Sequence, residues 1–172
     1  MSENTNPVST EETENTESTE NTGNTENTES TESTTPVATS VLNLAVEDVM
    51  DIIDGLNPFS TITRGALGTG NSLCCEISPS NPESVFMDKN SYIPLTLTIN
   101  GKHDDLMVLS DTLNTIMDTL TRQTSYPYGN GYEIVDITAG ITPRIIGREQ
   151  NNAWLMACEL VIKIYRKDEE TA

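Results

Sequence analysis

The residues best suited to chemistry are His103 and the two aspartates that follow it. A histidine beside carboxylates can support general acid–base catalysis, and His103 is the single histidine of the chain. Such catalysis also needs a nucleophile, and the sequence places none near Asp104 and Asp105. We therefore interpret His103 as part of a solvated turn, and we predict that the protein is not an enzyme.

The three cysteines are the second set with chemical potential. A zinc site would need Cys74, Cys75, Cys158 and His103 to converge. Neighbouring residues on a strand point to opposite faces, so the adjacent pair cannot readily bind one ion. The odd count favours reduced thiols. The glycine-rich stretch 65–70 lacks the Lys-Ser/Thr of a phosphate-binding loop, and we predict no metal and no cofactor.

The clearest pattern of secondary structure around these residues runs from Tyr92 to Gln123. Apolar residues alternate from Ile93 to Ile99, which indicates a half-buried strand. From Leu106 they recur at three- and four-residue steps on one face of a predicted helix, 104–123. Asn100-Gly101 indicates a turn between the two, and Asp104 or Asp105 can cap the helix.

The remaining patterns complete one domain. They predict a helix over 40–56, a hairpin of strands 60–64 and 73–78, and strands over 132–139, 142–149 and 154–166. Residues 150–153 indicate a hairpin turn, while Gly140 and Gly147 can mark bulges. We predict an α+β fold, with two helices packed on a largely antiparallel or mixed sheet.

The first residues have a different composition. Residues 1–40 contain four small or flexible apolar side chains and nine glutamates, and from Asn15 they fall into Asn-Thr-Glu-like triplets. Ordering them would cost on the order of 40 to 80 kcal/mol, which so few apolar groups cannot offset. We predict a disordered acidic tail over 1–39, a single domain over 40–167, and a disordered end over 168–172.

The charge limits the choice of partners. The formal net charge is −18, and an acidic body repels phosphate backbones. Gripped nucleic acid is disfavoured, although acidity would suit a lumen through which DNA slides. No apolar run approaches the roughly 18 residues of a membrane span, and no signal sequence is recognisable at the start. We expect folding in a cytoplasm, without a membrane partner.

The order of these motifs has a parallel in a known family. The run I-P-L-T-L-T-I-N-G-K-H-D-D-L enters an amphipathic helix, followed by Y-P, I-V-D-I-T, T-P-R-I-I-G-R-E-Q-N-N-A-W and E-L-V-I-K-I-Y-R. Over residues 40–167 this layout resembles the minor capsid or tail-terminator-like proteins of long-tailed bacteriophages. The resemblance implies a ring, commonly a hexamer, that caps the tail tube and presents a surface to the head connector.

The function expected from this resemblance is structural. The subunit would bind copies of itself, the tail tube protein and a head completion or connector protein, with DNA passing through the lumen. It would be assembled in the host cytoplasm and reside in the virion at the head–tail junction. The alternatives are a head completion or connector-stopper protein and a free-standing noncatalytic binding module on a flexible linker.

The loops 79–91 and 124–131 are the expected contact sites. In the first, the candidate contacts are Phe86, Asp88 and Lys89. In and directly after the second they are Tyr126, Tyr128 and Tyr132, which can form a binding surface or lie back on the edge of the domain.

Overall fold

The computed structural model describes residues 40–79 and 81–167, so the predicted tail 1–39 and the end 168–172 lie outside the described residues. The elements, in chain order, are α1 (Val41–Gly55), β1 (Ile62–Arg64), β2 (Ser72–Pro79), β3 (Ser84–Val85), β4 (Ser91–His103), α2 (Leu106–Arg122), β5 (Tyr128–Gly129), β6 (Tyr132–Arg148) and β7 (Trp154–Arg166).

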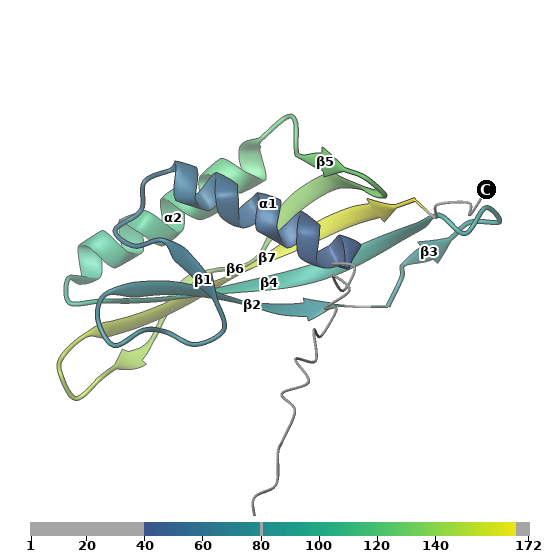
Figure 1. Ribbon diagram of the computed structural model, residues 1–172. Coiled ribbons are helices and arrows are strands. Elements are labelled where there is room, and N and C mark those ends of the chain that lie inside the picture. Colours follow the sequence, from purple (N-terminus) through teal and green to yellow (C-terminus); the bar gives the residue numbers. More distant parts are fainter. Residues whose placement is uncertain (1–39, 80, 168–172) are drawn as a thin grey trace, which may run out of the picture. The chain divides into compact units, whose positions relative to one another are not determined.

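The strands form one mixed sheet, in the order β1-β2-β4-β7-β6-β5, with β3 paired to one end of β4. All pairs are antiparallel except β1–β2. Both helices lie on one face of this sheet (Figure 1). The α+β prediction, with two helices packed on a largely antiparallel or mixed sheet, is therefore confirmed.

The core lies between the helices and the central strands β4 and β7. The alternating residues of β4 that the sequence assigned to one face are 0–4% exposed, namely Ile93, Leu95, Leu97 and Ile99. They pair in register with the apolar face of β7, from Cys158 to Ile164. The helical side chains that cover them are Ala45, Val46, Val49, Ile53, Leu109, Leu113, Ile116 and Leu120. Sheet alternation and helical periodicity thus meet in one apolar layer.

The start of α2 corrects one prediction. Asn100-Gly101 does not turn, because β4 continues in register to His103. A Cβ built on Gly101 would lie 2.6 Å from Cδ1 of Leu109, so the glycine admits the helix close to the strand. The turn comes later, and Asp105 caps α2 by accepting the backbone N–H of Met107 at 2.8 Å.

The region before β4 corrects a second prediction. The strands β1 and β2 do not form a hairpin but pair in parallel, with Ile62 opposite Leu73. Gly65 takes a left-handed conformation (φ 95°) directly after β1, and its N–H donates to the carbonyl of Cys75 at 3.0 Å. The loop 65–71 then carries the chain back, so that β2 runs in the same direction as β1.

The last strands follow the predicted hairpin, with one difference. The predicted strands 132–139 and 142–149 are one strand, β6, whose register with β7 shifts at four places. Two of these shifts include Gly140 and Gly147, as predicted for bulges. The turn to β7 closes through the N–H of Glu149 and the carbonyl of Ala153, with Asn152 left-handed at φ 72°.

Several polar contacts tie α1 to the sheet, among them the hydrogen bond from Ile62 N–H of β1 to Asp54 and a bond made by Tyr132. The hydroxyl of Tyr132 in β6 donates to Oδ2 of Asp48 in α1. Burial is the largest cause and this hydrogen bond the second of a pKa of Tyr132 that is raised to about 12. Within residues 40–79 and 81–167, neither helix has the length and apolar character needed to cross a membrane.

Candidate functional site

The hairpin between β3 and β4 carries three consecutive exposed apolar side chains, among them Met87, the most exposed large apolar side chain of the described residues. We call Val85, Phe86 and Met87 the apolar tip; they are 63%, 47% and 103% exposed. The tip is held by backbone hydrogen bonds, since Phe86 N–H donates to Asn90 and Lys89 N–H donates back to Phe86. It is therefore a defined turn that presents apolar groups to solvent.

Charged and aromatic neighbours fix the base of this hairpin. The rings of Phe86 and Tyr92 meet edge to face with centroids 5.7 Å apart, and Tyr92 also contacts Tyr165. Lys163 lies over the Tyr92 ring and forms an ion pair of 2.9 Å with Glu83. The hydrogen bond to Glu83 raises the pKa of Lys163. Asp88, a predicted contact, instead accepts hydrogen bonds from Asn90 inside the turn.

A pocket of about 250 Å³ opens between the α1–β1 connection and α2. We call it the helix pocket, and its lining residues are Leu56, Asn57, Pro58, Phe59, Val108, Asp111, Thr112, Thr115 and Ile116. One of the lining side chains is held from behind by an aromatic contact, because the Phe59 ring packs edge to face on His103 with centroids 4.7 Å apart. The lining offers apolar walls and one carboxylate, Asp111.

His103, interpreted from the sequence as part of a solvated turn, is the last residue of β4 and is half-buried. Its Nδ1 accepts the N–H of Asp105 at 2.9 Å, while its ring supports Phe59. The two aspartates beside it have structural contacts. The carboxylate of Asp105 caps α2, and the backbone N–H of Asp104 donates to the side-chain oxygen of Asn71 at 3.2 Å. These contacts give His103 a positioning role at the end of β4.

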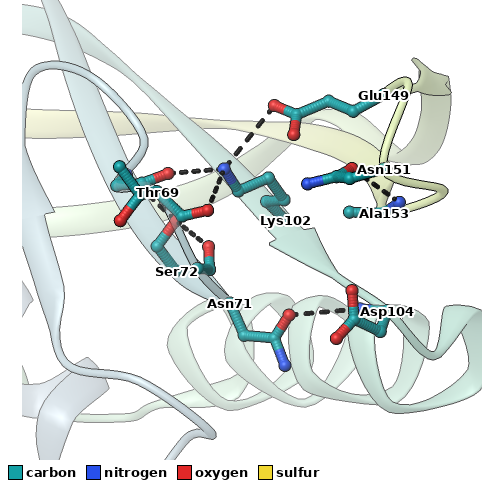
Figure 2. Close-up of polar contacts among 10 residues, drawn as sticks. Thr69, Asn71, Ser72, Lys102, Asp104, Glu149, Asn151 and Ala153 are labelled. Carbon is teal, nitrogen blue, oxygen red and sulfur yellow. Dashed lines mark hydrogen bonds and ion pairs between the residues drawn. The ribbon is translucent and has the colours of Figure 1, made fainter.

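A buried lysine organises the loop between β1 and β2. The amine of Lys102 donates to the carbonyls of Gly68 and Thr69, and Figure 2 shows it pointing at Thr69 and at the carboxylate of Glu149. The Lys102 residue is 4% exposed, and its Nζ lies 3.5 Å from Oε1 of Glu149. One cation thus joins the glycine-rich loop, β4 and the β6–β7 turn. The sequence gives no sign of this role, because Lys102 stands at an alternating polar position of the strand.

The outer edge of β6 is a further exposed surface. β5 pairs with it at Tyr132 and Glu133, and among the described residues no strand pairs with the edge beyond them. Val135, Ile145 and Ile146 lie there with 43–59% exposed. Bulges commonly protect such edges against pairing with a further strand. The irregular register of β6 therefore disfavours a partner that would add a regular strand to the sheet.

The three predicted tyrosine contacts have different places. Tyr132 is 4% exposed and held by Asp48, while the hydroxyl of Tyr126 donates to the carbonyl of Leu120 at 3.0 Å. Tyr128 is 81% exposed. In this structure Tyr128 alone of the three is freely presented to a partner.

The cysteines are isolated within the domain. All three are buried free thiols, and burial raises the pKa of Cys158 to about 12. Burial also raises the pKa of Cys74 and of Cys75. In the described part of the chain, no three His, Cys, Asp or Glu residues are grouped to hold a metal ion.

The fold of the chain is similar to that of a known virion protein, although its sequence matches no known family. No protein-family model and no curated protein matches the sequence. A solved chain from the virion of a native gene transfer agent (GTA) particle aligns with a TM-score of 0.51 at 10% identity. The alignment covers 72% of this chain and 94% of that chain. At this identity, the likeness shows a shared fold.

Proposed function

We propose that this chain is a noncatalytic structural protein of a phage-like virion. The observation that carries the proposal is the fold match, which takes in 94% of a chain from a gene transfer agent virion. The described polar groups support it, because His103, Asp105 and Lys102 are each engaged in holding the fold.

Within that class, the proposed role is a tail terminator at the head–tail junction. Subunits would close into a ring, expected to be a hexamer, that caps the tail tube and joins it to the head connector. Exposed apolar side chains follow one another on the hairpin (Val85, Phe86, Met87) and on β6 (Ile145, Ile146), and contiguous exposed apolar groups often mark protein–protein interaction sites.

The uncovered face of the sheet suits a ring through which DNA passes. Glu76, Thr98 and Glu159 are paired in one row across β2, β4 and β7. The alternation of β4 places this row opposite the core residues Leu97 and Ile99. Carboxylates and threonines facing a lumen would repel the phosphate backbone and leave DNA free to slide.

Electron microscopy tests this function. Negative-stain images of the purified full-length chain, alone and with tail tubes from its own virion, should show rings with a central opening, seated at one tube end. Single small particles in both samples, with bare tube ends, would contradict the terminator. Particles bound along tube sides would favour a free-standing binding module.

A further inference from the structure

We infer that the apolar tip of one subunit enters the helix pocket of a second copy of this chain. This contact rests on the proposed ring, and it names the two surfaces that would build it. The tip supplies Phe86 and Met87, while the pocket supplies apolar walls from the α1–β1 connection and α2.

The tip and the pocket match in size and polarity. Three consecutive apolar residues of the tip are at least 47% exposed, and the hairpin holds them in a fixed turn. Preformed apolar groups lose little conformational entropy on binding. The helix pocket, at about 250 Å³, has room for one large side chain between Phe59 and Val108.

The positions of the two surfaces require a second molecule. β4 begins at Ser91, which pairs with β3 beside the tip, and it ends at His103, which contacts Phe59 in the pocket. Its 13 residues correspond to about 40 Å of strand. Figure 1 shows β3 at one end of β4 and the start of α2 at the other. A subunit cannot reach its own pocket.

Two different surfaces in contact give a head-to-tail arrangement. Such a contact repeats from copy to copy, and it generates a ring when the rotation closes. An isologous dimer would instead need two reciprocal tip–pocket contacts across one two-fold axis, and it would leave neither surface free for a third copy. The proposed ring requires the heterologous arrangement, in which each copy gives its tip to one neighbour and its pocket to the other.

The charges beside each surface are complementary. Lys89 follows Met87 by two residues, takes a left-handed conformation (φ 67°) and forms no ion pair with another described residue. Asp111 lines the pocket. The carboxylate of Asp88 is already bonded to Asn90, so the turn presents a free cation to the neighbour's carboxylate. The expected intermolecular pair is Lys89 with Asp111.

Mixing two single variants tests the contact. Met87→Asp damages the tip and leaves the pocket, while Val108→Asp damages the pocket and leaves the tip. Met87 is fully exposed and Val108 is 39% exposed, so both variants should fold, as checked by circular dichroism and thermal melting. Each alone should be monomeric in sedimentation velocity, and an equimolar mixture should form a dimer that does not grow.

The charge pair and a matched control sharpen the result. Lys89→Glu should weaken assembly by about two- to fivefold, and Asp111→Lys in the same chain should restore it. Met107→Asp is the control, because Met107 precedes Val108, is 66% exposed and does not line the pocket. It should assemble like the unmodified chain.

The outcomes separate this contact from the proposed function. If the unmodified chain assembles and Met87→Asp or Val108→Asp alone assembles equally well, the contact is wrong while the ring stands. A monomeric mixture, or a Met107→Asp defect as large as that of Val108→Asp, also overturns the contact. If the unmodified chain is monomeric both alone and with tubes, the ring and the contact fail together.

Discussion

Leu109 of α2 occupies the space that the missing side chain of Gly101 leaves on β4. A Cβ at Gly101 would lie 2.6 Å from Leu109 Cδ1 and 3.1 Å from Leu73 Cδ2, and both leucines are fully buried. Since neither can move into solvent, Gly101→Ala should lower the free energy of unfolding by about 1 to 3 kcal/mol. Chemical denaturation measures this loss.

Gly70→Ala is the control for that prediction, because a Cβ there meets nothing within 4 Å. It should change the free energy of unfolding by less than about 0.5 kcal/mol. In the double variant Gly101→Ala with Leu109→Ala, the loss of unfolding free energy should be smaller than the sum of the losses in the two single variants. The shortened side chain at position 109 no longer clashes with the new Cβ. Full additivity would show that the two residues do not interact.

The bond between Tyr132 and Asp48 predicts a loss of stability in alkali. Burial and this bond raise the pKa of Tyr132 from 10.0 to about 12. Between these values the unfolded chain loses the proton while the folded chain keeps it, so stability falls as the pH rises. Tyr132→Phe has no such proton, and its stability should fall less steeply from pH about 10 upwards.

Urea unfolding at several pH values gives both curves. Cys158, whose pKa is also raised by burial, acts in the same direction but is present in both proteins and cancels in the difference. At neutral pH, Tyr132→Phe should cost about 1 to 2 kcal/mol for the lost hydrogen bond. Parallel curves above pH 10 would contradict the account.

The amine of Lys102 predicts a local effect on the loop 65–71. Lys102→Met removes its bonds to Gly68 and Thr69 and should cost about 1 to 3 kcal/mol. The amides of Gly65 and Gly68, which donate to Cys75 and Ser72, should exchange hydrogen faster. Arg122→Met, which breaks an exposed pair with Asp118, should cost under about 0.5 kcal/mol and leave those amides unchanged. Unaltered exchange in Lys102→Met would refute the role of the lysine.

The acidic first segment yields a prediction from composition. Residues 1–38 contain too few apolar groups to form a packed core. Deleting them should therefore leave the oligomeric state and the melting temperature of the domain unchanged. Sedimentation velocity and thermal melting of the shortened chain check this. A monomeric product would assign the segment a part in assembly.

The sequence was sufficient for the elements with strong periodicity. Alternation in β4 and β7 and the stripe on α2 identified the core, because burial on one face imposes those periods. The sequence was not sufficient where one local motif is compatible with two structures. Asn100-Gly101 is typical of a turn, yet Gly101 serves close packing of Leu109, and only the position of α2 reveals that.

The candidate site was partly visible in the sequence. Phe86 and Lys89 were predicted contacts, and a run of three apolar residues in a Ser-, Pro- and Asn-rich loop was a usable signal for Val85 and Met87. The helix pocket could not be predicted, because it joins residues 56–59 with residues of α2 that are far apart in the chain. Tyr132 was also predicted as a contact, because it follows a turn-rich stretch. It is instead buried, and its hydroxyl is bonded to Asp48 of α1.

Native mass spectrometry of the full-length chain over a concentration series tests the central claim most directly. A ring-forming subunit should give one closed oligomer of fixed copy number, with six copies expected from the resemblance, and few intermediates between it and the monomer. A monomer at every concentration, or an unbounded series of oligomers, would contradict a closed ring.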